Sequence, residues 1–441
     1  MHSLSKRGLL GLPRLLKIYS YQELHHSCKV LVVGGGTGGC SMAAKLSRKF
    51  KGSPKHVIVI EPNELHYYQP IFTLVGGGLS DFESSRRPMK NVLPKNAQWI
   101  KDSVMAFEPD NNKVITSNGD TIEYDIMIVA MGLQLLWDKV PGLINGLRDP
   151  DAQVCSIYGP ETVTEVFKKM ENTRDGQGVF TFPNSPVKCP GAPQKICYIA
   201  EDYWRRKGLR KNIRVTYNTS LPVLFGVKKY ADALWEVCRS RDIEVNLQRS
   251  LIEVRGSKRE AIFQNLQNPE DIVVEQYSFL HVCPPMGPPE ILKRHGILTN
   301  EAGFLCVDSQ TLRHTRYKNI YGLGDCTTTP NSKTMAAIAS QAKVLYENIM
   351  DDLSGKAMSH SYTGYASCPL VTGPGKCILA EFDYNLRPME TFPVDQKREL
   401  WIMYIMKKYF FPFLYWNFML KGYWNGPEVF RKYLTIFSQK S

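Results

Sequence analysis

Short apolar runs in the first third of the chain predict the buried strands of a parallel sheet. Lys29–Val33 and His56–Ile60 are two such runs, and Asp125–Ala130 is a third that follows a more polar lead-in. Continuous apolar runs are typical of strands covered on both faces, because a half-exposed strand alternates polar and apolar positions. The residues between the first two runs read as a helix that ends near Phe50. This strand–helix–strand order predicts an α/β fold.

A second α/β region follows a stretch rich in proline and glycine, Pro141–Pro150, which we interpret as a linker. It opens with the apolar strand Val179–Phe182 and includes a predicted helix over Lys229–Arg241. Its other predicted strands are Asn212–Tyr217, Glu244–Leu247 and Leu251–Val254. Asn319–Tyr321 is then a strand, and Thr334–Met350 reads as a long helix. The pattern therefore predicts two α/β domains, after which the chain changes character.

The six residues after the first strand carry the glycine pattern of a dinucleotide-binding loop. Gly34, Gly36 and Gly39 occupy the places that need a tight turn, a close approach to a pyrophosphate and close packing of helix on strand. The N-terminus of the following helix offers free N–H groups to phosphate. Glu61 ends the second strand 22 residues after Gly39, where a carboxylate can accept both hydroxyls of a ribose.

Two later segments favour FAD as the dinucleotide. Tyr124–Gly132 resembles the strand-and-glycine signature that follows the FAD unit in flavoproteins with two dinucleotide-binding domains. Tyr321–Asp325 resembles their second FAD signature, whose aspartate contacts the ribityl chain. The resemblance implies two Rossmann-like domains: an FAD domain over 29–150 and 300–355, and a second domain over 151–299, followed by a C-terminal region over 356–441.

The second domain lacks the loop that would bind a nicotinamide dinucleotide. The strand Val179–Phe182 is followed by PNSPVKCPGAP, residues 183–193, in which prolines and a lysine stand where phosphate needs free backbone N–H groups. Cys189 lies in this stretch, with Lys188 beside it and Lys195 six residues on. Because neighbouring cations favour the nucleophilic thiolate, Cys189 is predicted to be a redox-active thiol.

Cys368 is the second candidate thiol. It lies in Tyr365–Gly373, which reads as an exposed polar turn closed by proline and glycine. Cys326 is its rival, because it directly follows Asp325 and is expected to approach the same flavin. Cysteines inside apolar segments are expected to be buried and unreactive; these are Cys197, Cys238 and Cys306.

Composition and charge narrow the class of protein further. The 441 residues are 43% hydrophobic and 22% charged, as in globular proteins, and no run of about 18 apolar residues predicts a membrane-spanning helix. The eleven cysteines include no C-x-x-C pair and follow no secretory signal, so neither a disulfide framework nor a metal site is expected. The formal charge of +13 requires an acidic partner, and no nucleic-acid-binding signature accompanies it, so an anionic membrane surface is favoured over nucleic acid.

The two ends of the chain carry targeting and membrane features. The first 28 residues are basic and contain no acid up to Gln22, which predicts a mitochondrial transit peptide. Leu400–Trp424 combines many aromatic side chains with three lysines, and Pro412 interrupts any single helix. Apolar rings with flanking lysines are typical of an interfacial membrane anchor, which suits an enzyme that uses a lipid-soluble quinone. The residues predicted to line the quinone passage are Phe411, Phe413 and Tyr415.

Four segments are similar to the mitochondrial sulfide:quinone oxidoreductases, and the similarity extends over nearly the whole chain after residue 28. They are Tyr67–Gly76, Thr181–Cys189, Ser367–Gly373 and Phe411–Asn417. The resemblance implies that hydrogen sulfide attacks a disulfide of Cys189 and Cys368, with or without an extra bridging sulfur. A persulfide forms on Cys368, and its sulfur passes to an acceptor such as glutathione or sulfite. Electrons leave through FAD to ubiquinone at the matrix face of the mitochondrial inner membrane.

The resemblance and the glycine loop together predict the flavin contacts, which include a cation that would stabilise a reduced flavin, Lys333. The predicted contacts are Gly34, Gly36, Thr37, Gly38, Gly39, Glu61, Gln69, Val104, Gly324, Asp325 and Lys333. Two positions depart from the family pattern: Pro190 follows the first cysteine where a small residue is expected, and Cys40 follows the glycine loop. Two alternatives remain. An NADH:quinone oxidoreductase is disfavoured by the missing second loop, and a non-enzymatic flavoprotein relative leaves the cysteine pair unexplained.

Overall fold

The computed structural model describes residues 24–432. Most of the predicted transit peptide lies outside this range. The first strand, β1 (His25–Val33), already includes the last four residues of the predicted presequence, and His25–Cys28 pair with strand residues Thr121–Tyr124. Because these residues belong to the sheet, the predicted end of the presequence moves to residue 24 or earlier.

The first domain is built on a seven-stranded sheet with the order β5-β2-β1-β8-β7-β6, and β19 pairs with β8. The strands are β1, β2 (Val57–Ile60), β5 (Gln98–Ile100), β6 (Val104–Glu108), β7 (Lys113–Thr116), β8 (Thr121–Val129) and β19 (Ile320–Gly322). The pairs around β1 are parallel, and β6 and β7 extend the sheet antiparallel. In β1 the first residues alternate in burial and the last four are all buried, so the strand's carboxyl end lies inside the domain.

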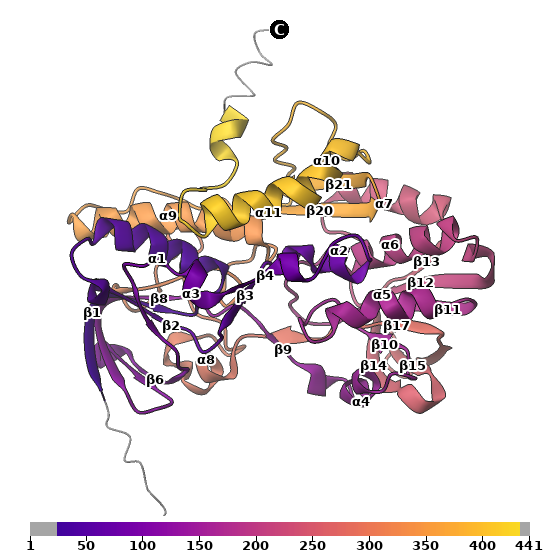
Figure 1. The fold of residues 1–441 in the computed structure, drawn as a ribbon, viewed down its shortest axis with the longest axis horizontal. Helices are drawn as coiled ribbons and strands as arrows, with labels where there is room; N and C mark the ends of the chain where they lie inside the picture. Colours follow the sequence, from indigo (N-terminus) through magenta and orange to yellow (C-terminus); the bar gives the residue numbers. More distant parts are fainter. Residues whose placement is uncertain (1–23, 433–441) are drawn as a thin grey trace, which may run out of the picture.

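Two helices from distant parts of the sequence cover this sheet. They are α1 (Thr37–Lys49) and α9 (Met335–Leu353), which lie side by side in Figure 1 and are in direct contact. The strand β19 and α9 thus return to the first domain after the second domain is complete. The sequence predicts an FAD domain that consists of two such parts.

The second domain holds a five-stranded parallel sheet with the order β10-β17-β11-β12-β13. Its strands are β10 (Val154–Cys155), β11 (Gly176–Phe182), β12 (Ile213–Thr219), β13 (Ile243–Asn246) and β17 (Phe279–His281), and its helices are α5 (Val163–Asn172), α6 (Ala192–Arg206) and α7 (Lys228–Ser240). A separate antiparallel sheet holds β14 (Arg249–Arg255), β15 (Glu260–Asn265) and β16 (Ile272–Gln276). The stretch interpreted as a linker, Pro141–Pro150, contains the helix α4 (Leu143–Arg148).

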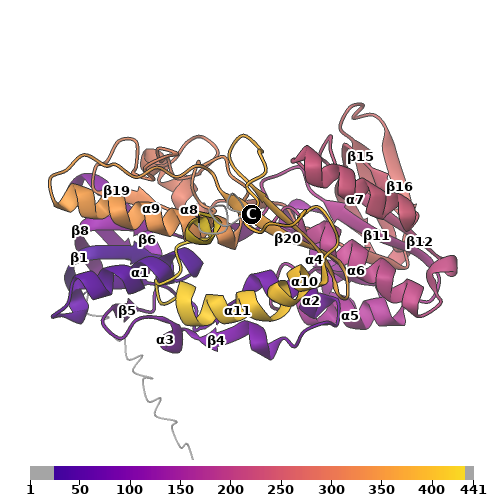
Figure 2. The ribbon, with the colours of Figure 1, turned by 90° about the horizontal axis from the view of Figure 1, so that it is seen from above.

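The C-terminal region places a hairpin and a helical segment between the two domains. The hairpin consists of β20 (Ala366–Gly373) and β21 (Lys376–Phe382). The helical segment runs from α10 (Trp401–Ile405) through α11 (Phe411–Leu414) to Met419, with a wider π-type turn after each helix. Pro412 was predicted to interrupt any single helix; it lies in the first turn of α11, directly after a π-type turn, so the segment stays helical without being one regular α-helix. Figure 2 shows α10 and α11 in yellow beside the space between the two domains.

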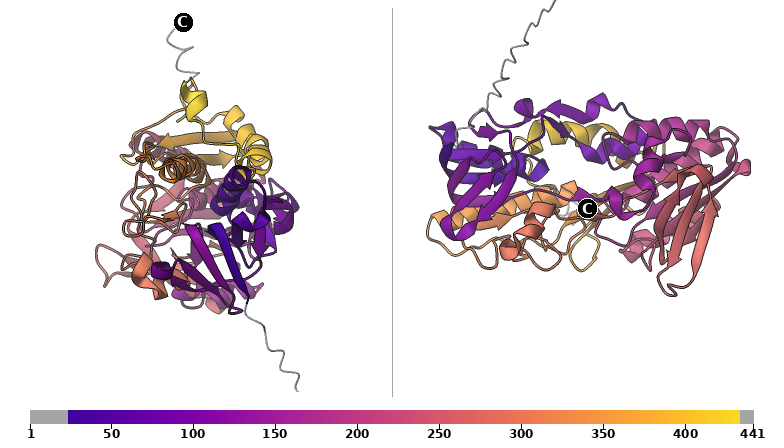
Figure 3. Two further views of the ribbon diagram at one scale, coloured as in Figure 1. Left: turned by 90° about the vertical axis from the view of Figure 1, so that its left-hand side faces the viewer. Right: turned by 90° about the horizontal axis from the view of Figure 1, so that it is seen from below.

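Short elements complete the fold, and Figure 3 shows the two domains at opposite ends of the molecule. The short elements are β3 (Leu65–Tyr67), α2 (Phe72–Gly76), β4 (Arg86–Pro88), α3 (Met89–Val92), β9 (Gln134–Leu135), β18 (Met286–Gly287) and α8 (Glu290–Arg294). Between residues 24 and 432, none of the helices combines the length and apolar character that crossing a bilayer requires.

Candidate functional site

A cavity of about 830 Å³ lies between the two domains and collects most of the predicted site residues. Of the predicted flavin contacts and quinone-passage residues, those that line it are Gly34, Gly36, Thr37, Gly38, Glu61, Gln69, Gly324, Asp325, Lys333, Phe411 and Tyr415. Three predicted residues are not among its lining residues. Gly39 packs against the backbone of Gly34, Val104 is buried in the sheet core, and Phe413 is 55% exposed at the surface.

The glycine loop has the shape that a pyrophosphate needs. A Cβ atom on Gly34, which has a φ of 102°, would meet the Ala130 carbonyl oxygen at 2.6 Å. A Cβ on Gly39 would meet the Gly34 oxygen at 1.8 Å, so only glycine lets α1 pack this closely on β1. A Cβ on Gly36 would meet no described atom within 4 Å, and no side chain caps α1 there. The first N–H groups of α1 therefore face the cavity, as a bound phosphate requires.

The predicted ribose-binding acid is held in place at the same end of the cavity. One oxygen of the buried Glu61 carboxylate accepts from the Gly35 N–H at 2.7 Å, and the other accepts from the Asn63 N–H at 2.8 Å. The oxygen bonded to Asn63 also accepts from the Asn63 side-chain amide at 2.6 Å, whereas the oxygen bonded to Gly35 retains a lone pair for a further donor. The glycine loop, Glu61 and the α1 N-terminus together fit the adenosine diphosphate half of FAD.

A half-buried acid and a half-buried cation, Asp325 and Lys333, lie in the lining of the same cavity. Asp325 lines the cavity, and burial raises the pKa of its carboxyl group although Lys333 opposes the shift. The Lys333 ammonium donates to the carbonyl oxygens of Thr327 and Thr329 at 2.8 and 3.0 Å. Burial lowers the pKa of Lys333. The Lys333 side chain is thus fixed by the chain beside Asp325, in a position to face a bound flavin.

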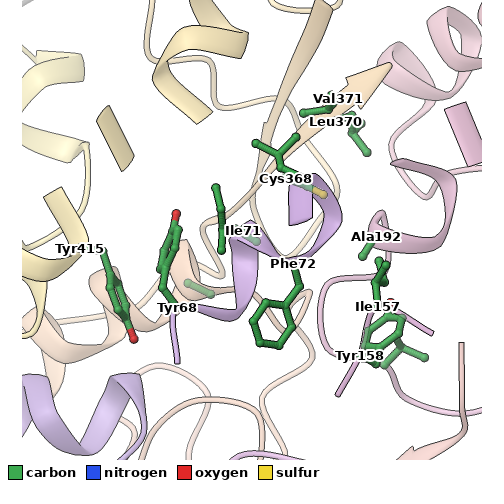
Figure 4. Packing of buried hydrophobic residues seen from close by; sticks show 14 of the residues in the cluster. Tyr68, Ile71, Phe72, Ile157, Tyr158, Ala192, Cys368, Leu370, Val371 and Tyr415 are labelled. Carbon is green, nitrogen blue, oxygen red and sulfur yellow. The ribbon is translucent and has the colours of Figure 1, made fainter. Parts of the chain in front are cut away.

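The two predicted thiols come together beside this cavity, which Cys189 lines and Cys368 does not. The Sγ atoms of Cys189 and Cys368 lie 4.0 Å apart, twice the length of a disulfide bond of about 2.05 Å. Cys368 lies in β20 and is 2% exposed, so the prediction of an exposed turn is wrong. The turn-like residues around it pair with β21 over the whole of β20, and this long-range pairing buries the thiol. In Figure 4 the Cys368 sulfur points toward Ala192 at the start of α6.

Gly191 makes the approach of Cys368 possible, and its role was not predicted from the sequence. A Cβ atom on Gly191 would lie 2.7 Å from the Cys368 sulfur and 2.6 Å from a methyl carbon of Leu370. Any larger residue at this position would therefore push β20 away from the start of α6. The only signal in the sequence is a glycine immediately before a helix, which also fits an ordinary cap.

The backbone of Cys189 is strained and firmly held. Cys189 has a φ of 53°, in the left-handed region that non-glycine residues rarely adopt. Its N–H donates to the Lys333 carbonyl oxygen at 2.7 Å, and its own carbonyl oxygen accepts from Ala192 N–H and from the Tyr158 hydroxyl. Such strain persists only where the surroundings fix the conformation, and it is typical of functional sites. The loop thereby presents the thiol to Cys368 and to the cavity.

Two buried lysines surround the sulfur pair. The Lys195 ammonium donates to the Cys189 sulfur at 3.2 Å and lies 3.7 Å from the Cys368 sulfur. The hydrogen bond from Cys368, together with the charges of Lys195 and Lys407, holds the pKa of Cys189 well below its usual value. The pKa of Cys368 is raised, chiefly because its thiol donates to Cys189. In the reduced pair, Cys189 is therefore the thiolate and Cys368 the thiol.

Lys407, which the sequence placed in a membrane anchor, belongs to this site instead. Its side chain is 2% exposed and its ammonium donates to the Pro70 carbonyl oxygen at 2.7 Å. Burial and, after it, the charge of the nearby Lys195 lower the pKa of Lys407 to about 8. Both lysines line the cavity, so the two sulfur atoms lie beside a positively charged chamber that attracts anions.

Cys326, the rival of Cys368, does not join the pair. It is fully buried, its thiol faces the Val129 and Leu323 carbonyl oxygens, and burial raises its pKa. Its position after Asp325 therefore reflects packing beneath the flavin site.

The cavity extends to the opposite face of the β20–β21 hairpin. Side chains alternate along a strand, so Ser367 and Pro369 face away from Cys368, and their partners Glu381 and Leu379 share that face. All four line the cavity. Apolar residues from the C-terminal region close this part, which we call the hairpin arm: Phe392, Trp424, Pro427 and Phe430. Phe430 is also 55% exposed, so the hairpin arm reaches the molecular surface there.

Comparison with known proteins gives a consistent result. A family model described as pyridine nucleotide-disulphide oxidoreductase matches residues 28–165. The chain is 46% identical to the mitochondrial sulfide:quinone oxidoreductase of Mus musculus over 404 residues, covering 92% of this chain and 89% of the mouse protein. It is 40% identical to the protein of the same name in Dictyostelium discoideum, covering 96% and 92% of the two chains.

A solved structure supports the fold independently. The X-ray structure of the sulfide:quinone oxidoreductase from the hyperthermophilic bacterium Aquifex aeolicus matches with a TM-score of 0.77 at 21% identity. The match covers 94% of this chain and 95% of the bacterial chain. Both domains and the C-terminal region therefore have counterparts in that structure.

Proposed function

Since this chain belongs to the mitochondrial sulfide:quinone oxidoreductases, and so oxidises sulfide with a quinone as electron acceptor, we propose that Cys189 and Cys368 perform the sulfur chemistry. The observation that carries this proposal is the pair of sulfur atoms 4.0 Å apart beside the Lys195 ammonium. The membership sets aside the non-enzymatic alternative, and the loop at Cys189, which offers no phosphate cradle, disfavours the NADH-dependent one.

The sulfur step is a thiol–disulfide exchange. With the two cysteines joined as a disulfide, hydrosulfide attacks the sulfur of Cys368, a new S–S bond forms, and the old bond breaks. Cys368 then holds a persulfide and Cys189 leaves as a thiolate. The sulfur of sulfide has been oxidised and the disulfide reduced by the same two electrons. The Lys195 ammonium lies nearer the sulfur of Cys189 than the sulfur of Cys368, so it stabilises Cys189 as the leaving thiolate, which favours attack at Cys368.

Transfer of the outer persulfide sulfur to an anionic acceptor completes this half of the reaction. Sulfite or the thiolate of glutathione attacks that sulfur, and Cys368 is released as a thiolate. Lys195 and Lys407 place two cations at the pair, where they favour an anionic acceptor and stabilise both leaving thiolates. Oxidation of the two thiolates then restores the disulfide and releases two electrons.

FAD is the flavin that the site fits best. The open loop at Gly36 would hold the pyrophosphate of FAD, and the carboxylate of Glu61 would accept from the ribose. Asp325, which lines the cavity, would contact the ribityl chain. A bound flavin supplies two-electron transfer between the thiolates and the quinone. Lys333, fixed by two carbonyl oxygens, would offset negative charge on the reduced ring.

Ubiquinone is proposed to enter the hairpin arm. The arm is closed by apolar C-terminal side chains, reaches the surface at Phe430, and is separated from the sulfur pair by the hairpin itself. This position differs from the passage predicted at Phe411, Phe413 and Tyr415, because Phe413 is exposed and Tyr415 is buried against the glycine loop. Separate faces for sulfide and quinone would keep the two substrates from reacting directly.

The exposed aromatic residues of the C-terminal segment are proposed to bind the inner mitochondrial membrane from the matrix side. Exposed apolar residues gather there, including Trp401, Ile402, Phe410, Phe413 and Phe418. Isolated exposed apolar residues are common, but a contiguous group is typical of a membrane or protein contact. The same stretch of chain ends at Trp424, which lines the hairpin arm, so one segment joins the proposed membrane contact to the proposed quinone site.

Phe413→Asp is expected to weaken binding to anionic phospholipid vesicles by about 10- to 100-fold, because burying one aromatic side chain contributes about 1.5–3 kcal/mol. Co-sedimentation with vesicles measures the effect. Leu353→Asp is the matched control, since Leu353 is 50% exposed on α9, outside the C-terminal segment, while Phe413 is 55% exposed. Equal losses in the two variants, or none in Phe413→Asp, would place the membrane contact elsewhere.

Anaerobic reduction of the flavin tests the proposed function directly. Sulfide is expected to bleach the flavin absorbance within one turnover, and a ubiquinone analogue to restore it. NADH is expected to leave the spectrum unchanged, because prolines replace the N–H groups that would bind its phosphates. Bleaching by NADH without bleaching by sulfide would overturn the proposal.

A further inference from the structure

Helix α1 carries a stripe of polar side chains that all contact the C-terminal segment. The stripe is Thr37, Ser41, Lys45 and Arg48, spaced by four, four and three residues, which places them on one helix face. At its N-terminal end the Thr37 and Tyr415 hydroxyls lie 2.9 Å apart. The Ser41 hydroxyl lies 3.1 Å from the carbonyl oxygen of Met419. The part of α1 nearest the phosphate cradle is therefore bound to the segment that carries the exposed aromatic residues.

The other end of the stripe holds the turn that follows. The Lys45 ammonium donates to the Asn425 side-chain oxygen at 2.6 Å. The Arg48 guanidinium donates to the carbonyl oxygens of Lys421 and Gly422. A Cβ on Gly422 would approach within 2.8 Å of the Lys45 side chain, so the turn packs tightly against the helix. We call the contact between these four α1 side chains and residues 415–425 the α1 latch.

A buried hydrogen-bond chain continues the α1 latch into the glycine loop. Tyr415 bonds to the His66 ring at 2.6 Å, and the other ring nitrogen of His66 lies 3.0 Å from the Gly35 carbonyl oxygen. That oxygen can only accept, so Nδ1 of His66 carries the proton and Nε2 accepts from Tyr415. The Tyr415 oxygen in turn accepts from Thr37. Every member of the chain is satisfied in this single orientation, and burial lowers the pKa of His66 to about 4, which keeps the ring neutral.

This chain of hydrogen bonds fixes the backbone of Gly35, which lies next to the phosphate cradle. Gly35 donates its N–H to Glu61 and accepts at its carbonyl oxygen from His66 and from the Cys40 thiol at 3.1 Å. The backbone orientation of Gly35 sets the position of Gly36, beside which no described atom lies within 4 Å of a Cβ position, so that a pyrophosphate has room there. Cys40, a departure from the family pattern, thus has a structural role in the loop.

The C-terminal segment therefore has one face buried against α1 and one face exposed to solvent. Tyr415 and Met419 are buried against α1 and its surroundings, while Phe413 and Phe418 are exposed on the opposite side. Figures 1 and 2 both show α11 running beside the start of α1. A surface that binds the exposed side of this segment would also stabilise the contacts of the α1 latch. Those contacts in turn order the glycine loop.

We propose that FAD and a membrane surface bind this protein cooperatively, and that the α1 latch carries the coupling. The proposal rests on the proposed function, in which FAD fills the cavity and the C-terminal segment meets an anionic bilayer. Coupling free energies are reciprocal, so a membrane that orders the segment slows release of FAD, and bound FAD tightens membrane attachment. Enzyme that has lost its flavin would then leave the membrane more readily than loaded enzyme.

The rate of FAD release from the holoenzyme tests the coupling. Release is followed by the rise in flavin fluorescence after dilution, with and without vesicles of phosphatidylcholine and cardiolipin. Vesicles are expected to slow release about tenfold, within the usual range of such couplings. Arg48→Met removes two latch bonds at the end of α1 away from the phosphate cradle, and is expected to speed release and to reduce the vesicle effect to less than about threefold. Lys49→Met loses the same charge from an exposed neighbour and should behave as the unchanged protein.

A second variant tests the buried chain itself. Tyr415→Phe keeps the ring but breaks the bonds to Thr37 and His66, and is expected to release FAD about tenfold faster in solution. Tyr409→Phe, at an exposed position of the same segment, is its control. Vesicle sedimentation is measured in parallel. Vesicles that bind without changing FAD release would overturn the coupling and leave the proposed function standing. Failure of the holoenzyme to bind vesicles would overturn both the coupling and the proposed membrane surface.

Discussion

Cys368→Ser is expected to lower the rate of flavin reduction by sulfide at least about 10³-fold while leaving the flavin bound. A serine hydroxyl cannot form the disulfide that hydrosulfide attacks, and loss of a covalent participant typically has an effect of this size or larger. The same loss is expected for Cys189→Ser, because neither cysteine can form the bond alone. Stopped-flow absorbance under anaerobic conditions measures the rate, and the flavin spectrum of the purified variant reports cofactor content.

Cys326→Ser is the matched control for this pair. Cys326 is fully buried near the flavin site but its thiol faces carbonyl oxygens of its own domain. Its substitution is expected to leave sulfide-dependent reduction within about threefold of the unchanged protein wherever the variant folds, since it removes no group from the sulfur pair. An inactive Cys326→Ser together with an active Cys368→Ser would assign the second thiol to Cys326.

Lys195→Met is expected to reduce sulfide-dependent flavin reduction about 10- to 100-fold at neutral pH. A hydrogen bond to a charged group contributes about 1.5–3 kcal/mol, and the Lys195 ammonium makes such a bond to Cys189 at 3.2 Å. Methionine has a similar length and no charge. Without the ammonium the pKa of Cys189 rises, so less of this residue is thiolate and it leaves less readily.

The pH dependence distinguishes this electrostatic role from a packing defect. Because Lys195→Met raises the pKa of Cys189, the variant should regain activity as the pH increases and the thiolate forms again. The unchanged protein, in which the pKa of Cys189 is already low, should show no such rise from the thiol. Lys207→Met, at the exposed C-terminal end of the same helix, is the control and should follow the unchanged protein. A uniform loss at every pH in Lys195→Met would argue for distorted packing.

Features that depend on local sequence were predicted well. The glycine loop, the strands that flank it and the long helix at 335–353 lie within a few residues of their expected bounds, because each depends on a short pattern of apolar residues and glycines. Cys189 was found from the prolines and lysines around it. The missing second loop likewise needed no knowledge of the fold.

Features that depend on contacts between distant parts of the sequence were not predicted. Cys368 was predicted to be exposed, since nothing near it shows that β20 pairs with β21 and lies against Gly191. Lys407 was assigned to the membrane surface, although tertiary packing places it beside Cys189. His66 carried no signal at all, because its partners Gly35 and Tyr415 lie 31 and 349 residues away. In each case the neighbours that decide the role of the residue lie far away in the sequence.

The position of the first persulfide tests the central claim most directly. One equivalent of sulfide is added anaerobically to the oxidised holoenzyme without a sulfur acceptor, free thiols are alkylated, and the peptides are analysed by mass spectrometry. The account predicts an additional sulfur on the Cys368 peptide and an alkylated Cys189 without one. An additional sulfur on Cys189, or on any cysteine outside this pair, would contradict it.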